Sequence, residues 1–403
     1  MSMSKRAMLF GLAALGLSIG GCASTTPRIA YTAAEAESAE IPGMPADIRF
    51  YADAPASVFA RFRQGVVAQA QARHEPVTFL ALSSGGSDGA FGAGFLKGLS
   101  ESHQRPTFTV VSGISTGALM APFAFLGPRY DATLQDLYTN GYASALVKDA
   151  SVLNALVGNA LVDSDKLGKF IAHYIDQPIL DAVAAEHRKG RRLIVVTTNI
   201  DQQRSVIWDM GAIAASGSAN ALPLFRQVLA ASASIPALFP PRLIAVESGG
   251  HSFQEMHVDG AAVRQIYVAP DALIFGGRDA GPSPIKDIYV LVNNKIDPSF
   301  KVVDNSAVSV AARGLSTILK REGRSNVLAS YAYAASHGIG YHIAFIDADV
   351  PEPPSTDATE QFGTEYMTTL FARGEARGRT ASPWLARPSL ATDPAGREMS
   401  AAR

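Results

Sequence analysis

The feature that most constrains the fold is the segment Gly113-Ile-Ser-Thr-Gly117, together with its two neighbours. The β-branched run Phe108-Thr-Val-Val precedes it, and the apolar residues 116–126 follow and suit a helix. A serine between two glycines on a sharp strand-to-helix turn is a nucleophile elbow, in which the backbones approach too closely for a Cβ. The five residues alone also fit an ordinary turn, but the strand and the helix favour the elbow. The segment therefore predicts an α/β unit with Ser115 as nucleophile.

A second strand-turn-helix unit comes immediately before the elbow. Residues 77–82 predict a buried strand and residues 90–101 a helix, and the turn between them is rich in glycine. Such a turn exposes consecutive backbone N–H groups at a helix N-terminus, where they can bind a phosphate or the oxyanion of an acyl-transfer intermediate. Ser84 occupies the first glycine position of a dinucleotide fingerprint, and no P-loop Lys-Ser/Thr pair follows. With an elbow one unit later, we interpret the turn as an oxyanion loop.

Strands and helices alternate through the rest of the chain. Strands are expected at 77–82, 108–112, 193–198, 205–208, 287–293 and 341–346, and helices at 90–101, 116–126, 165–174, 178–188, 219–231 and near 305–335. This alternation predicts an α/β fold of three layers, with a mainly parallel central sheet and helices on both faces. No Pro/Gly-rich break divides residues 77–350, so we expect them to form one domain.

The first 21 residues predict a lipoprotein signal peptide. Lys5 and Arg6 precede an apolar run that is shorter than the about 20 residues of a membrane-spanning helix. Ile19-Gly-Gly-Cys22 resembles a bacterial lipobox, whose cysteine becomes the lipidated N-terminus; an unrelated cysteine after a simple signal is the alternative. Cys22 is the only cysteine, so no internal disulfide can form, and its acyl chains would anchor the protein to a membrane. Ser24 replaces the aspartate that often marks inner-membrane retention, so we expect the bacterial cell envelope and, within it, the outer membrane.

Two further segments flank the expected domain. Residues 22–76 are rich in Ala, Glu, Pro and Ser, and we interpret them as a tether with one helix at 56–72. After residue 350 we expect a linker and then a helix whose apolar residues share one face: Phe362, Tyr366, Met367, Leu370 and Phe371. That helix either packs on the domain or contacts a membrane or a lid. Residues 378–403 lack periodicity and predict a disordered tail.

Charge and motif content narrow the class of partners. The chain has 35 Lys or Arg and 36 Asp or Glu, a net charge of −1, whereas a nucleic-acid-binding surface would be basic. No H-E-x-x-H or comparable ligand cluster occurs, so we expect neither a metal nor another cofactor. The sequence leaves the oligomeric state open.

A serine nucleophile needs a base to accept its proton. His337 and His342 stand in the order usual for α/β-hydrolases, but the first lies near a predicted helix end and the second opens a predicted strand. Asp259 offers a carboxylate instead. It ends a short strand just before Gly260, and ligands of parallel α/β sheets bind at strand ends. An isolated Asp-Gly pair is also a common β-turn.

Four blocks within residues 77–270 together resemble the patatin-like phospholipase family. They are the glycine-rich loop 84–89, the elbow 113–117, the small residues 231–241 that end in Phe-Pro-Pro, and Asp259-Gly-Ala261. The resemblance implies a Ser–Asp dyad without histidine, with Ser115 as nucleophile and Asp259 as general base. It also implies that N–H groups of Gly85, Gly86 and Ser87 hold the oxyanion. The other matched motif positions are Ser84, Gly89, Gly113, Gly117, Gly260 and Ala261.

The sequence departs from the family pattern at two positions. Ser84 stands where the family has its first loop glycine, and a serine there is strained if the position requires a positive φ. Asp88 stands where the family usually has Arg or Lys. The loss of that positive charge predicts that a lipid with an anionic head group is a poorer substrate than a neutral ester or a lysolipid.

We therefore expect a serine lipolytic acyl hydrolase of the phospholipase, lysophospholipase or lipase type, lipid-anchored and acting through an acyl-enzyme. One alternative is a carboxylesterase or thioesterase acting on soluble esters. Another is a lipid-binding lipoprotein whose oxyanion hole Ser84 has impaired. If Asp259 is not the base, His257 is the next candidate, because it lies on the same strand face. The apolar segment 154–162 suits either a mobile cover over an acyl groove or buried packing.

Overall fold

The computed structural model describes residues 28–55, 57–59, 64–68, 76–147, 164–236, 238–275, 284–350 and 358–388. The predicted signal peptide, Cys22 and the segment 154–162 lie outside these residues. In the described part of the chain, no helix is both long and apolar enough to cross a membrane.

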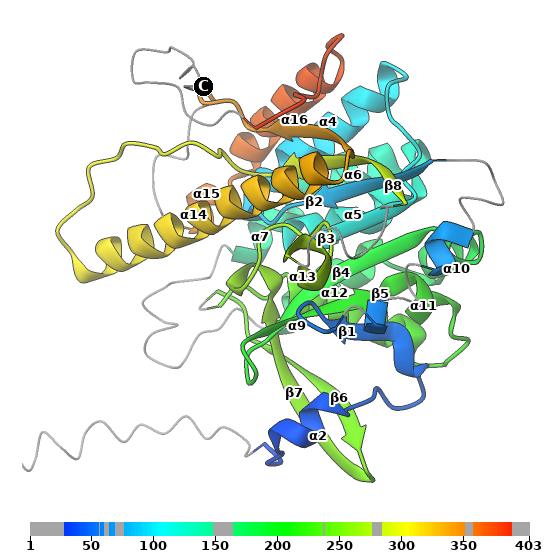
Figure 1. Cartoon of the computed structure of the whole chain (residues 1–403). Coiled ribbons are helices and arrows are strands. Elements are labelled where there is room, and N and C mark those ends of the chain that lie inside the picture. Colours follow the sequence, from blue (N-terminus) through cyan, green and yellow to red (C-terminus); the bar gives the residue numbers. More distant parts are fainter. Residues whose placement is uncertain are drawn as a thin grey trace, which may run out of the picture.

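Nine strands form a single sheet at the centre of the molecule (Figure 1). The order is β1-β5-β4-β3-β2-β8-β9, and β7 pairs with both β4 and β6. The five strands from β4 to β9 in this order are parallel to one another, and the pairs with β1, β5, β6 and β7 are antiparallel. The strands are β1 (Arg49–Tyr51), β2 (Val77–Leu82), β3 (Val110–Ile114), β4 (Arg192–Asn199), β5 (Arg204–Asp209), β6 (Arg242–Ser248), β7 (His251–Asp259), β8 (Ile285–Val292) and β9 (Gly340–Phe345).

Helices cover both faces of this sheet, so the expected three-layer α/β fold is confirmed. Alternate residues of each central strand enter two separate apolar clusters, as the period of two in a strand requires. Leu80, Leu82 and Val195 belong to one cluster, whereas Phe79 and Val196 belong to the other. The helices are α2 (Ala33–Glu37), α4 (Gly89–Glu101), α5 (Thr116–Leu126), α6 (Asp131–Thr139), α7 (Tyr142–Val147), α9 (Ser164–Tyr174), α10 (Gln177–Arg188), α11 (Met210–Ala215), α12 (Ala221–Ser232), α13 (Asp271–Phe275), α14 (Ala307–Ser336), α15 (Ala358–Gln361) and α16 (Thr364–Gly378), with 3₁₀ turns at 46–48, 86–88, 128–130 and 260–262.

Two predicted elements differ in form from the observed ones, and α6 and α11 lie where no helix was expected. The short strand expected before Asp259 is the second arm of a long hairpin, β6–β7, whose turn is Gly249-Gly250. Both glycines have positive φ, +56° and +86°, which is the signature of a tight two-residue hairpin turn. The helices expected near 305–335 are one continuous helix, α14.

Both flanking segments contribute to the domain more than expected. Residues 49–51, predicted to lie in a tether, form β1 and pair with β5. Within the tail predicted to be disordered, Leu385 bridges to Ile343, and the Trp384 ring packs edge-on against the rings of Phe95 and Tyr289. These contacts extend the folded unit beyond the predicted limits of 77 and 350.

The helix predicted after residue 350 packs on the domain, which is one of the two alternatives. It is α16, and it lies against α4 through glycines on both helices. A Cβ on Gly94 would clash with the Phe371 carbonyl, and a Cβ on Gly374 would clash with that of Phe91. The two backbones are therefore in direct contact.

Candidate active site

The ends of two strands meet on one edge of β4, and the predicted nucleophile and base lie at that junction. The register pairs β3 with β4 up to Ile114 opposite Val196, and β7 with β4 from Thr197 opposite Asp259. Because β5 occupies the other edge of β4, β3 and β7 share this one. They run in opposite directions and end tip to tip.

Ser115 and Asp259 are in direct contact at this junction. The Ser115 hydroxyl donates a hydrogen bond to the carboxylate Oδ2 of Asp259, with an Oγ–Oδ2 distance of 2.5 Å. Ser115 has φ +57° and ψ −122°, a strained conformation for a residue with a side chain, as the elbow geometry requires. Both residues are buried, with 4% and 2% of their surface exposed. The sharp turn thus holds the hydroxyl against the carboxylate and away from bulk water.

The glycines of the predicted motifs lie where this arrangement leaves no room for a side chain. A Cβ on Gly113 would clash with the Gly117 carbonyl, and one on Gly117 would stand 2.6 Å from the Ser83 carbonyl oxygen. A Cβ on Gly260 would stand 2.5 Å from the Val196 carbonyl oxygen. None of the three has a positive φ, so close backbone approach is what requires glycine here.

Two serines that sequence reasoning did not single out hold the junction together. Ser232 Oγ accepts a hydrogen bond from the Ser115 N–H at 3.0 Å and donates one to the Val196 carbonyl at 2.7 Å. The Ser234 carbonyl accepts from the Asp259 N–H at 2.9 Å. Both residues belong to the block of small residues at the end of α12. Their signal in the sequence was the block itself, which forms hydrogen bonds with the backbones of both Ser115 and Asp259.

The environment of Asp259 favours proton transfer near neutral pH. Burial raises the pKa of Asp259 to about 7, and the hydrogen bonds from Ser115 Oγ and from the Ala261 N–H offset this only in part. No cationic side chain contributes to this shift. A carboxylate with a pKa near the working pH is suited to act as a general base.

The predicted oxyanion loop adjoins the elbow. A Cβ on Gly89 would clash with the side chain of Thr116, and Gly86 adopts a left-handed backbone with φ +58°. Among the described residues, no acceptor is present for the backbone N–H of Gly85, Gly86 or Ser87. Three donors on one turn beside the nucleophile can bind a developing negative charge.

Residues 80–270 match the family model of the patatin-like phospholipases. This segment forms a patatin-like phospholipase domain. The family implies a lipid acyl hydrolase, and its members are generally serine hydrolases. A solved structure with some similarity is that of VipD from Legionella pneumophila, which is 15% identical, with 74% of this chain and 67% of that chain covered and a TM-score of 0.32. No curated protein matches the chain.

Ser84 is not strained in the patatin-like domain, because its φ is not positive. Its hydroxyl donates to Gln265 Oε1, and its N–H donates to the Gln265 carbonyl at 3.1 Å. Gln265 Nε2 in turn donates to the Ala261 carbonyl at 3.1 Å. The serine therefore links the oxyanion loop to the turn that carries Asp259, a role that its sequence did not reveal.

Helix α16 and the turn before it reach the oxyanion loop. Tyr366 Oη donates to Asp88 Oδ1 at 2.9 Å, and the Phe362 ring lies 3.5 Å from the point where a Cβ of Gly86 would stand. Asp88 thus places a carboxyl group at the loop position where the family resemblance implies Arg or Lys.

The histidines considered as bases have other partners. His257 is fully buried and bonds to Thr197 Oγ1 at 2.9 Å and to Glu255 Oε2 at 3.0 Å. His342 bonds to Asp287 at 3.0 Å and stacks on Tyr289. His337 bonds to the Tyr333 carbonyl at 2.9 Å. The structure therefore leaves Asp259 as the one of these four that contacts Ser115.

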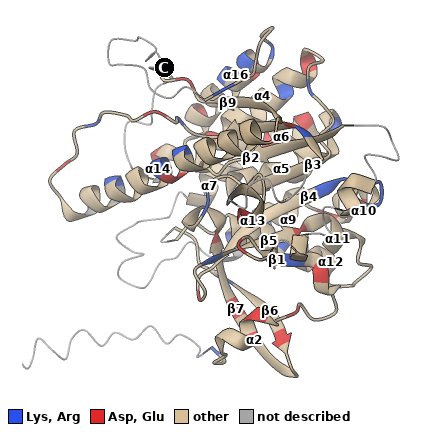
Figure 2. Ribbon diagram, in the orientation of Figure 1, with Lys and Arg blue, Asp and Glu red and all other residues tan. Residues whose placement is uncertain are grey.

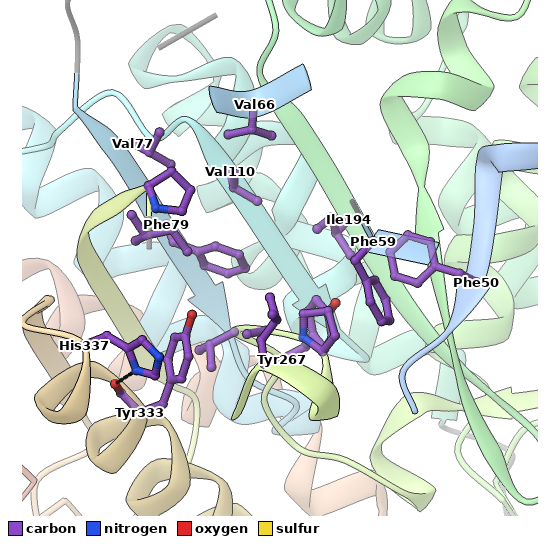
Figure 3. A pocket seen from close by; sticks show the side chains of 16 residues that line it. Phe50, Phe59, Val66, Val77, Phe79, Val110, Ile194, Tyr267, Tyr333 and His337 are labelled. Carbon is purple, nitrogen blue, oxygen red and sulfur yellow. Dashed lines mark hydrogen bonds between the residues drawn. The ribbon is translucent and has the colours of Figure 1, made fainter. Parts of the chain in front are cut away.

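An apolar pocket lies elsewhere in the same domain, and Figure 3 shows its lining side chains. Val77, Val110 and Ile285 line it, and each begins a parallel strand. Ser115 follows the carboxyl end of β3, whereas the pocket lies at the amino ends of the parallel strands. The pocket and Ser115 are therefore at opposite ends of these strands. In the described part of the chain, no group of three or more His, Cys, Asp or Glu is arranged to hold a metal ion.

Proposed function

We propose that the chain hydrolyses carboxylic esters of lipids through a Ser115–Asp259 dyad. The observation that carries this proposal is the 2.5 Å hydrogen bond between the serine hydroxyl and the aspartate carboxylate at the tips of β3 and β7. Asp259 accepts the proton of Ser115 as Oγ attacks the ester carbonyl. The tetrahedral intermediate then expels the alcohol, which takes up that proton, and leaves an acyl group on Ser115.

The second half of the reaction uses the same residues. Asp259 accepts a proton from a water molecule that attacks the acyl-enzyme, and Ser115 regains the proton as the fatty acid leaves. In both halves, the N–H groups of Gly85, Gly86 and Ser87 stabilise the negative charge on the former carbonyl oxygen. One such donor contributes about 10²–10³-fold to a rate in acyl-transfer enzymes.

The test is covalent labelling and turnover of three variants. A fluorophosphonate probe should label the parent protein. It should label Asp259→Asn slowly or not at all, and it should not label Ser115→Ala. The rate of hydrolysis of a short nitrophenyl ester should be lower than that of the parent in both Asp259→Asn and Ser115→Ala. Ser330→Ala is the matched control, because Ser330 is equally buried and hydrogen-bonded but lies on α14. Labelling of Ser115→Ala, or no labelling of the parent, would contradict the proposal.

Two alternatives predict different results in the same assays. An esterase or thioesterase for soluble substrates would show no rise in rate when a lipid ester passes its critical micelle concentration, whereas we expect a sharp rise. A lipid-binding protein without activity would remain unlabelled. The unstrained Ser84 and the contact between Ser115 and Asp259 favour an active enzyme.

We further propose that Asp88 disfavours anionic head groups in the site. It lies at the end of the oxyanion loop, where the family resemblance implies Arg or Lys, and its carboxylate accepts a hydrogen bond from Tyr366 Oη at 2.9 Å. Neutral diacylglycerol should be cleaved faster than phosphatidylglycerol when both are presented in neutral detergent micelles, and Asp88→Asn should narrow the difference. Faster cleavage of phosphatidylglycerol would refute this preference.

We also propose that Cys22 carries the membrane anchor, in the outer membrane of a bacterial envelope. The support is the lipobox-like Ile19-Gly-Gly-Cys22 and the absence of any other cysteine. Cys22→Ser should abolish metabolic labelling with palmitate. Continued labelling of that variant would place acylation elsewhere.

A further inference from the structure

The N-terminal half of α14 projects from the domain. Residues 314–318 are all exposed, and five consecutive helical residues point to every side of a helix. Figure 1 shows this end of α14 extending beyond the body of the protein. The segment before the helix lies alongside it, because Arg313 donates to the Ser299 carbonyl at 2.5 Å and Lys320 Nζ donates to Ser299 Oγ at 3.0 Å.

This projection carries large apolar side chains in solvent. Phe300 is 95% exposed and Val302 80%, and Val310, Leu315 and Ile318 are each more than half exposed. On a helix, the last three fall within a sector of about 140°. They make up five of the eleven exposed large apolar residues of the described chain, within 19 positions. Such clustering marks an interaction surface, unlike apolar residues that are exposed singly.

The same stretch is basic, although the whole chain is not. Residues 300–321 contain four Lys or Arg and one Asp, against a net charge of −1 for the chain, whereas Arg324, further along α14, is paired with Asp297. Figure 2 shows cationic positions along α14. Apolar side chains flanked by Lys and Arg, on a helix that cannot span a bilayer, are typical of a helix lying in the head-group region of an anionic membrane.

The segment that leads to this projection begins at the carboxyl ends of the parallel strands, where Ser115 and Asp259 meet. Residue 293 follows the carboxyl end of β8, and Asn293 bonds through its side-chain N–H to the Ser83 carbonyl, beneath the oxyanion loop. Further along α14, Asn326 Oδ1 accepts hydrogen bonds from the N–H groups of Gln265 and Ile266. A membrane touching this surface would therefore lie toward the carboxyl ends of the parallel strands, where Ser115 is located.

We propose that residues 300–318 form a docking surface for membranes that contain anionic lipids. Phe300, Val302 and Ile318 enter the bilayer interface, and the flanking cations lie against lipid head groups. This contact is separate from any acyl chain on Cys22 and does not require catalysis.

Vesicle sedimentation tests the proposal on the full chain carrying Cys22→Ser, which removes the expected anchor, and Ser115→Ala, which prevents hydrolysis. We expect binding to phosphatidylcholine vesicles containing phosphatidylglycerol, weaker binding to phosphatidylcholine alone, and loss of binding at high salt. The triple change Phe300→Ser, Val302→Ser and Ile318→Ser should weaken binding about tenfold or more. The matched control, Ile29→Ser, Val58→Ser and Leu243→Ser, changes three exposed apolar residues elsewhere and should bind like the parent.

Three outcomes would overturn the docking surface. The first is that the triple variant binds vesicles as tightly as the parent, and the second is that phosphatidylglycerol does not increase binding of the parent. The third is that light scattering shows a dimer of the parent and a monomer of the triple variant, which would make the patch a contact between copies of the chain. With Ser115 restored, the triple variant should cleave a soluble nitrophenyl ester at the parent rate and vesicle lipid more slowly. If the protein with Ser115 intact cleaved no soluble ester, the result would contradict the proposed function but not the docking surface.

Discussion

Two buried carboxylates on β7, Glu255 and Asp259, lie four residues apart on the same strand face and have opposite properties. Arg49 donates to both oxygens of Glu255, at 2.5 and 3.1 Å, and His257 is its second partner. Burial favours a higher pKa for Glu255, but the hydrogen bond with His257 and the charge of Arg49 outweigh it and lower the pKa. For Asp259, no cationic side chain among the described residues contributes to the shift, and burial raises its pKa to about 7. The comparison shows that the partners, rather than burial, decide which carboxylate is kept as a fixed charge and which can exchange a proton.

The largest expected effect is on catalysis. Asp259→Asn should lower kcat for a nitrophenyl ester by about 10²–10⁴-fold, because the amide cannot accept the Ser115 proton. Glu255→Gln should change kcat by no more than a few fold, since Glu255 does not contact Ser115. Steady-state rates per folded molecule measure both. If the two variants lost activity equally, the base would lie in the Glu255 network, with His257 as the first candidate.

For stability, the substitution of Glu255 should have the larger effect and that of Asp259 the smaller one. Glu255→Gln leaves the buried Arg49 guanidinium without its counter-charge and should lower the free energy of unfolding by about 3 kcal/mol or more. Asp259→Asn removes a carboxylate that is costly to ionise in the fold, so it should not destabilise the protein above pH 7. Urea unfolding at pH 8 compares the two. A Glu255→Gln protein as stable as the parent would show that the ion pair contributes nothing.

The pH dependence of the rate separates the two carboxylates further. The base is active only when ionised, so with a pKa of about 7 for Asp259, kcat/KM should rise about tenfold per pH unit below pH 7 and level off above it. The stability contribution has the opposite sign. Because the folded pKa is above the unfolded value of 3.8, stability from this group is full below about pH 4 and is lost as the pH rises through 7. A rate profile that is flat between pH 5 and 8 would refute Asp259 as the base.

The smallest expected effect comes from Ser232, which touches the elbow but not the substrate. Ser232→Ala leaves the Ser115 N–H without an acceptor and should reduce kcat roughly tenfold and stability by about 1–2 kcal/mol. Ser232→Thr keeps the hydroxyl and should restore part of the rate without changing the pH profile. A rate drop with a shifted profile would instead indicate that Ser232 acts on Asp259.

The sequence predicted the residues that meet at the junction, Ser115 and Asp259, more fully than the residues that support them, for a physical reason. The elbow and the Asp-Gly turn are local, since Gly113, Gly117 and Gly260 mark backbones that approach too closely for a Cβ. The partners of Glu255 are not local: Arg49 is 206 positions away, in a segment that composition alone suggests is a tether. Gln265 likewise gains its role only when folding brings Ser84 beside it. Pairings of this kind leave no spacing pattern to read.

Some strands and helices were also easier to predict from the sequence than others. The parallel strands were predictable because each is a short apolar run next to a helical period. The β6–β7 hairpin was missed because its outward-facing residues are polar and break the run, although Gly249-Gly250 marked the turn. The expected tail and tether were misassigned because Trp384 and β1 pack through contacts with distant parts of the chain.

The backbone contact between α4 and α16 has a consequence for the shortest polypeptide that can work. The family match ends at residue 270, yet the helix that begins at the oxyanion loop rests on glycines more than 90 positions further on. A recombinant fragment that ends at residue 270 or 350 would lack α16 and would expose the face of α4 that contacts it, next to the proposed oxyanion loop. Anyone who trims this protein for crystals or for engineering should keep the sequence through residue 388.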